Sequence, residues 1–430
     1  MPRINSVLSL KKNTGIIWPL VLIQFLRLIG VSDQVTFVII LGYIIFMFIN
    51  AKKIIIPHII GMKLYLIFIV YATFIGLLMQ STRAWGRDLF YILPTITIIF
   101  SGYFCNEIYP EKSVLKTIYV IGFMISIVAF IKLLTNPSVL NEFSDLRQTI
   151  GIEIYEVSMI FVAFVIEKIF FGKTIFSKVM DILILFLMLA QIILSFGRTQ
   201  IIMIVAMLVF ALICNIIYNR SFINSIVRIT IIALVGVSFI YACIMLVPND
   251  IYNDFSEKWE TTSTEINTNQ EIDTELEALE NWRAYEMQSA TKQWKKSNVF
   301  AMLFGKGLGE GIKIKFVPVL WKQLQITENG KIAILHNGYY TVLVKGGIIG
   351  TIAMIILYLS GIYMMFRYIK KYPSLAKELV IAGAFSVGGA IQGYVVNGIF
   401  TLHYMFCWAA YLGYVNSKLN NAKAKVDNEN

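Results

Sequence analysis

Long apolar stretches separated by short polar connections make up most of the chain. A helix needs roughly 20 predominantly apolar residues to cross the hydrocarbon core of a bilayer, which is about 30 Å thick. By this measure the pattern predicts about twelve spans, with one long polar segment after the ninth. The predicted spans lie near residues 15–30, 35–51, 63–80, 87–105, 114–134, 151–171, 179–197, 199–218, 226–248, 346–367, 379–398 and 400–417.

The pattern therefore predicts an all-α protein, a polytopic bundle of transmembrane helices with one large extracytoplasmic loop. The composition agrees, since 57% of the residues are hydrophobic, 15% are charged and the mean hydropathy is +0.71. These values exclude a soluble globular protein. The expected divisions are spans 1–9 (residues 1–248), the loop with surface helices (249–335), a re-entrant helix with spans 10–12 (336–418) and a cytoplasmic tail (419–430).

The distribution of lysine and arginine predicts the orientation of the spans. Most of these residues lie in every second connection, and the positive-inside rule assigns that side, with both termini, to the cytoplasm. The net charge of +11 is spread over these connections instead of forming one basic face, which argues against nucleic acid as a partner. No small-residue cleavage site follows the first apolar run, so we expect that run to remain as a helix.

The opposite short connections carry four positive residues, and all are arginines: Arg83, Arg87, Arg147 and Arg198. A planar guanidinium group binds a carboxylate or phosphate through two parallel hydrogen bonds, whereas lysine acts as a point charge. We therefore expect these residues to bind an anionic substrate on the outer face. Arg198, in the short SFGRTQ connection, also fits the usual position of an interfacial arginine that reaches lipid headgroups.

The large loop begins with an acidic half, Asp250–Glu280, and continues with a more basic one. From Leu276 onward apolar residues recur at roughly helical spacing, which predicts a surface helix that carries Arg283. Glu280 and Glu286 stand on either side of this arginine at a spacing that allows intrahelical ion pairs. Such pairs are the alternative explanation for Arg283.

Gly305, Gly307 and Gly309 resemble a phosphate-binding loop, but no predicted strand precedes them and no Lys-Ser/Thr pair follows, so we expect a turn that ends a helix.

The mostly apolar stretch around and after His336 is too long for one straight span. We place a break at Gly346–Gly347, with a short re-entrant helix before it. His336 then lies at the outer membrane surface, where an imidazole can accept a proton from a hydroxyl group. A structural role is the alternative for a lone histidine.

Metal ions and disulfides have little support in the sequence. No histidine has a partner four residues away, and no two cysteines have the spacing of a metal or redox motif. We expect no disulfide, metal or cofactor, although a magnesium or calcium site built from oxygen ligands stays open. The residues considered are His58, His336, His403, Cys105, Cys214, Cys243 and Cys407.

Taken in order, these blocks resemble the O-antigen ligase and O-antigen polymerase family of bacterial membrane glycosyltransferases. That family has an arginine-containing helix hairpin, a long outer loop with a Trp-Arg helix and a Gly-x-Gly turn, and then His-Asn-x-Tyr and Gly-x-x-Gly motifs. The matching residues are Ser195–Arg198, Trp282-Arg283, Gly305–Gly309, His336-Asn337 with Tyr339, and Gly347–Gly350. The resemblance runs from about Met180 to Tyr368 and lacks only the family's frequent proline before the Gly-x-Gly turn.

The resemblance implies a metal-independent enzyme of the bacterial inner membrane whose donor glycan is carried on undecaprenyl diphosphate. It implies that Arg198 and Arg283 hold the diphosphate and that His336 orients or deprotonates the acceptor hydroxyl. Asn337 and Tyr339 would be further substrate-binding residues. Candidate partners are the lipid-linked oligosaccharide, membrane lipids, a flippase and a chain-length regulator.

Within the family we expect a polymerase that joins repeat units of O-antigen, capsule or exopolysaccharide. A ligase that transfers the glycan to lipid A-core or another acceptor needs the same donor site and is the first alternative. A lipid-linked glycan flippase is the second, and intramembrane charges such as Arg27, Lys132, Glu153 and Glu156 would line its path. Transporters often contain two related halves, whereas this sequence has no evident repeat. A structural scaffold would leave the outer-face arginines unexplained.

Overall fold

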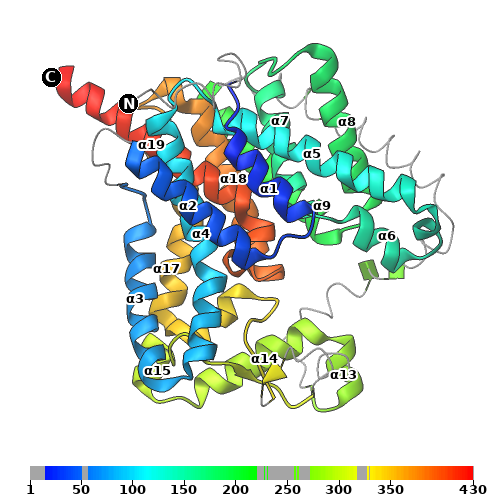
Figure 1. Cartoon of the computed structure of the whole chain (residues 1–430), viewed down its shortest axis with the longest axis vertical. Helices are drawn as coiled ribbons and strands as arrows, with labels where there is room; N and C mark the ends of the chain where they lie inside the picture. The colour runs from blue at the N-terminus through cyan, green and yellow to red at the C-terminus, as the bar shows by residue number, and fades with distance from the viewer. Residues whose placement is uncertain are drawn as a thin grey trace, which may run out of the picture.

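The computed structural model describes residues 15–50, 57–219, 272–316 and 330–429, together with 227, 230, 256–257, 259–260 and 327–328. Helices dominate this part of the chain (Figure 1). The first group comprises α1 (Trp18–Leu28), α2 (Asp33–Asn50), α3 (Met62–Met79), α4 (Thr82–Ile108), α5 (Val114–Thr135), α6 (Phe143–Ile150), α7 (Ile154–Ile169), α8 (Lys178–Leu194) and α9 (Arg198–Asn219). The second comprises α13 (Glu275–Glu280), α14 (Trp282–Lys295), α15 (Val299–Phe304), α17 (Gly338–Tyr368), α18 (Ala376–Val395) and α19 (Leu402–Glu429).

Six helical segments in the described part are long and apolar enough to cross a membrane: α3, α4, α5, α9, α17 and the segment that ends with α18. Helices α6 and α7 add a seventh if the pair, which is bent by 58°, forms one span. Helix α1 and most of α2 are apolar but shorter. The predicted span near 226–248 lies outside the described residues, apart from 227 and 230. The structure is therefore a multi-pass helical protein, and the count of twelve spans stays a prediction.

Helices α4 and α19 pack so closely that their backbones touch. A Cβ atom on Gly102 would lie 1.9 Å from the carbonyl oxygen of Ala410, and one on Gly413 would lie 1.9 Å from that of Ile99. Only glycine allows this approach, which is typical of helix pairs in membrane bundles. The main core lies beside this contact, where Trp408 of α19 is only 1% exposed.

Helix α17 is broken at Gly347, which confirms the break predicted from the sequence. This residue has φ 63° and ψ −164°, a conformation that only glycine adopts readily. The break leaves the carbonyl groups of Val344 and Lys345 without their usual helical partners. They accept hydrogen bonds instead from the backbone N–H groups of Lys306, at 3.0 Å, and Gly307, at 2.9 Å.

The glycine turn, Gly305–Gly309, supplies these donors. It ends α15, as predicted, and lies between α3 and α17. Gly305 has φ 77°, and a Cβ atom there would lie 2.2 Å from the carbonyl oxygen of Lys345. A Cβ atom on Gly307 would lie 2.3 Å from the backbone nitrogen of Gly76 in α3. The turn thus fixes the large loop to the helix bundle.

The described part of the large loop has a small core of its own. The predicted surface helix is divided at Asn281 into α13, which begins with a capping box formed by Thr274 and Glu277, and α14. Three two-residue strands add an antiparallel sheet, in the order β1–β3–β2, to the all-α architecture that we expected. They are β1 (Ile312–Lys313), β2 (Thr327–Glu328) and β3 (Lys331–Ile332). Helices α13–α15 lie at the opposite end of the molecule from the C-terminal end of α19 (Figure 1).

Candidate functional site

His336 lies between α14 and the turn after α18. The buried carboxylate of Glu286, in α14, accepts a hydrogen bond from the His336 backbone N–H at 2.9 Å and contacts the ring nitrogen Nδ1 at 3.0 Å. On the other side, the His336 carbonyl oxygen accepts a hydrogen bond from the backbone N–H of Asn397 at 2.5 Å. The His336 side chain is 42% exposed, so Glu286 holds one edge of the ring while part of the side chain reaches the surface.

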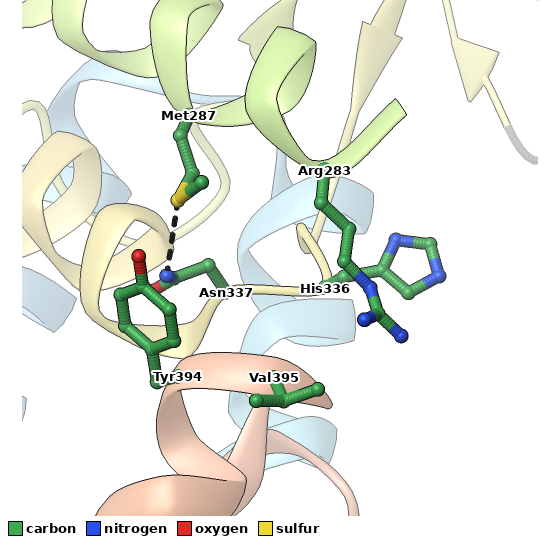
Figure 2. Close-up of a pocket in the computed structure, with 6 residues that line it drawn as sticks. All are labelled: Arg283, Met287, His336, Asn337, Tyr394 and Val395. Carbon is green, nitrogen blue, oxygen red and sulfur yellow. Dashed lines mark hydrogen bonds between the residues drawn. The ribbon is translucent and has the colours of Figure 1, made fainter. Parts of the chain in front are cut away.

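Arg283 and His336 line the same pocket (Figure 2). Helix α14 supplies Arg283 and Met287, which stand one turn apart, and the segment before α17 supplies His336 and Asn337. Figure 2 shows the Arg283 and His336 side chains together at one edge of the pocket. The end of α18 closes the opposite wall. The full lining is Arg283, Met287, His336, Asn337, Tyr394 and Val395.

Asn337 and Tyr339 hold this segment in place. The Asn337 side-chain oxygen accepts hydrogen bonds from the backbone N–H groups of Tyr339 and Tyr340, so it caps α17, and its Nδ2 donates to the sulfur of Met287 at 3.3 Å. The Tyr339 hydroxyl donates to the carbonyl oxygen of Ala390 at 3.0 Å. These contacts are structural, and the predicted substrate contacts of Asn337 and Tyr339 stay predictions.

Arg283 also shares its surroundings with Arg147. Both guanidinium groups lie within electrostatic range of the Tyr155 hydroxyl in α7, which forms a hydrogen bond with Thr199 in α9. The residue that precedes Thr199 is Arg198, the first residue of α9. Two of the arginines that the sequence singled out, Arg147 of α6 and Arg283 of α14, therefore lie near the same hydroxyl group, beside the first turn of α9.

Helix α6 is held against the turn that carries Arg198. In that turn Phe196 has a positive φ of 48°. Its buried ring packs against the ring of Phe143, with the two ring centroids 6.0 Å apart. Leu146 and Ile150 of α6 belong to the same cluster. This packing turns the apolar face of α6 toward the α8–α9 turn and leaves Arg147 exposed.

Arg83 and Arg87 lie elsewhere, in the first turns of α4. Arg87 lines a second pocket between α4, the glycine turn and β3, none of whose lining residues is shared with the His336 pocket. Its Nε atom lies 3.5 Å from the carboxylate of Asp88. Arg83 is exposed and lines neither of these pockets. A substrate-binding role for these two residues stays a prediction.

Two residues of this site were not predicted. Glu286 was considered only as a partner of Arg283, because both lie on one helix. Tyr155 lies in a predicted span and carries no motif. Among the described residues, no group of three His, Cys, Asp or Glu side chains is arranged to hold a metal ion.

A comparison with protein families identifies part of the chain. Residues 183–355 match the family model described as O-antigen ligase. This segment belongs to the O-antigen ligase and polymerase family. No curated protein matches the chain significantly. The matched segment runs from α8 through the break in α17 and includes Arg198, Arg283 and His336. It supplies four of the six residues that line the pocket in Figure 2, and α18, outside the match, supplies Tyr394 and Val395.

Proposed function

We propose that this protein is a membrane glycosyltransferase that polymerises undecaprenyl-diphosphate-linked oligosaccharide repeat units on the outer face of the bacterial inner membrane. The products would be O-antigen, capsule or exopolysaccharide chains. The main support is that Arg283 and His336, both in the segment that matches the family, line one pocket, and that Arg147 and Arg283 both lie within electrostatic range of the Tyr155 hydroxyl.

His336 is the general base in this proposal. It accepts the proton of the acceptor hydroxyl while the hydroxyl oxygen forms a bond to the anomeric carbon of the donor. The bond between that carbon and the diphosphate oxygen breaks, and its electron pair leaves with the lipid diphosphate. General-base assistance of this kind contributes about 10²- to 10⁴-fold to the rate.

Arg283, with Arg198 and Arg147, is proposed to bind the diphosphate and to stabilise the negative charge that develops as it leaves. Preorganised cationic donors act most strongly where charge appears in the transition state. Guanidinium groups fit phosphate oxygens in pairs. Because the leaving diphosphate is stable as an anion, the reaction needs neither a general acid nor a metal ion.

Ligation is the second candidate, because the matching family is described by its ligases. A ligase would use the same donor site and the same base. It would differ in its acceptor, which would be lipid A-core or another molecule instead of a second lipid-linked repeat unit.

The test uses the purified chain in proteoliposomes supplied with undecaprenyl-diphosphate-linked repeat units, with and without a lipid A-core acceptor. A ladder of longer lipid-linked glycans supports the polymerase. Glycan transfer to the added acceptor without a ladder supports the ligase. Movement of unchanged lipid-linked glycan between leaflets, with no new glycosidic bond, would contradict both.

A further inference from the structure

The carboxylate of Glu286 is surrounded by hydrogen-bond donors. The indole Nε1 of Trp282 donates to Oε1 at 2.7 Å, and the backbone N–H of His336 donates to Oε2 at 2.9 Å. The His336 ring nitrogen Nδ1 lies 3.0 Å from Oε1 and 3.1 Å from Oε2. The Glu286 side chain is 1% exposed. Both of its oxygens are therefore engaged by protein groups and shielded from solvent.

These contacts determine which ring nitrogen of His336 carries the proton. An indole N–H and a backbone N–H can only donate, so both oxygens of Glu286 act as acceptors. An ionised carboxylate has no proton to give, which means that Nδ1 must be the donor in its contact with Glu286. In the neutral ring the lone pair is then on Nε2. That nitrogen is on the opposite edge of the ring from Glu286.

We propose that Glu286 is a positioning residue that holds His336 in the Nδ1–H tautomer, in which the lone pair of Nε2 acts as the base. The inference rests on the proposed function of His336. When Nε2 takes the proton of the acceptor hydroxyl, the ring becomes an imidazolium, and the adjacent carboxylate stabilises its charge. Trp282 completes the arrangement by fixing the orientation of the Glu286 carboxylate.

A merely structural Glu286 would tie α14 to the start of α17 and nothing more. Glu286→Gln separates the two roles because glutamine has the same shape but offers an NH₂ donor. Whichever way the amide is turned, the NH₂ group faces a fixed N–H group, of Trp282 or of His336, and competes with Nδ1 as a donor. The substitution therefore favours the opposite tautomer while it preserves the volume of the side chain.

The first readout is spectroscopic and does not depend on activity. In protein labelled with ¹⁵N-histidine, His336→Ala identifies the ring signals of His336 among the three histidines of the chain. The proposal predicts a protonated Nδ1 and an unprotonated Nε2 in the neutral wild-type ring, and a shift toward the Nε2–H form in Glu286→Gln. A wild-type ring protonated on Nε2 would overturn the proposal.

The second readout is turnover of the lipid-linked donor. Glu286→Gln should lower kcat by about 10²- to 10⁴-fold, with KM for the donor changed about twofold or less. The range is that of general-base assistance, and its upper end matches the loss of about 10⁴-fold when the orienting carboxylate of a serine-protease histidine becomes an amide. Glu286→Asp keeps the charge and should recover at least part of kcat. Glu280→Gln removes an exposed carboxylate from the neighbouring helix and is the matched control, with wild-type kcat expected. Wild-type kcat in a folded Glu286→Gln would overturn the proposal.

The two readouts separate this inference from the proposed function. If the wild-type ring has the predicted tautomer but His336→Ala keeps full activity, the proposed function of His336 fails while the tautomer assignment stands. If His336→Ala loses activity but Glu286→Gln does not, the proposed function stands and the positioning role fails. If Glu286→Gln does not fold, the wild-type tautomer and the kcat of Glu286→Asp still decide the question.

Discussion

Asp88→Ala should strongly destabilise the protein, because it removes the partner of a buried ammonium group. Lys345 of α17 is fully buried and Asp88 of α4 is 1% exposed. The Lys345 Nζ atom donates to the Asp88 carboxylate and to the carbonyl oxygen of Glu310, each at 2.5 Å. The same carboxylate accepts a hydrogen bond from the backbone N–H of Gly309 at 2.6 Å. One carboxylate thus joins α4, the glycine turn and α17.

The expected magnitude follows from what the substitution leaves behind. Removing one partner of a buried ion pair costs about 3–5 kcal/mol, because the other charge remains buried without compensation. The Gly309 N–H also loses its acceptor, and an unsatisfied buried donor costs about 1–3 kcal/mol. The two effects share one site and do not simply add. We therefore expect the free energy of unfolding to fall by at least about 3 kcal/mol.

The assay is a double-mutant cycle, with reversible denaturation in detergent of wild type, Asp88→Ala, Lys345→Met and the double variant. Lys345→Met alone should also destabilise, since it leaves Asp88 buried without its counter-charge. The double variant should be more stable than the sum of the two single effects predicts, because neither charge is then left alone. Glu111→Ala, at an exposed carboxylate, is the control and should stay within about 0.5 kcal/mol of wild type. An Asp88→Ala protein as stable as wild type, or strictly additive effects, would refute the reasoning.

Three further outcomes are expected. Gly305→Ala should lower the unfolding free energy by more than about 1 kcal/mol, because φ is 77° and the new Cβ would meet the backbone of Lys345. The control Gly86→Ala, in α4 with no atom within 4 Å of its Cβ, should be neutral or stabilising by about 0.5–1 kcal/mol. Equal melting temperatures for the two variants would contradict this expectation. Arg283→Lys should lower turnover on the order of 10²-fold despite its retained charge, since lysine cannot make two parallel hydrogen bonds to a phosphate, and unchanged turnover would exclude a bidentate role. Excess chelator should leave turnover of the wild-type protein unchanged, and a loss of activity that magnesium restores would show that a metal is needed.

Local features of this fold could be predicted from the sequence. The break at Gly347 follows from an apolar stretch that is too long for one span and from two adjacent glycines. The end of α15 at Gly305 follows from the glycine spacing. The meeting of Arg283 and His336 was predicted through the family resemblance, and each residue alone had a plausible structural explanation.

Contacts between distant residues could not be predicted. The spacing of Glu286 and Arg283 predicted an ion pair within one helix, yet the Glu286 carboxylate contacts His336, in the segment between β3 and α17. The pairing of Asp88 with Lys345 joins the first third of the chain to its last third. Asn337 belongs to a motif, but its side chain caps α17, and capping depends on where the helix begins. No periodicity or spacing encodes these contacts.

Turnover of undecaprenyl-diphosphate-linked repeat units by purified His336→Ala, compared with wild type, tests the central claim most directly. Glu280→Gln serves as the folded control, and binding of the donor is measured in parallel. The account predicts that His336→Ala still binds the donor but forms glycosidic bonds at least about 10²-fold more slowly. A folded His336→Ala protein that extends glycans at the wild-type rate would show that the pocket in Figure 2 is not the active site.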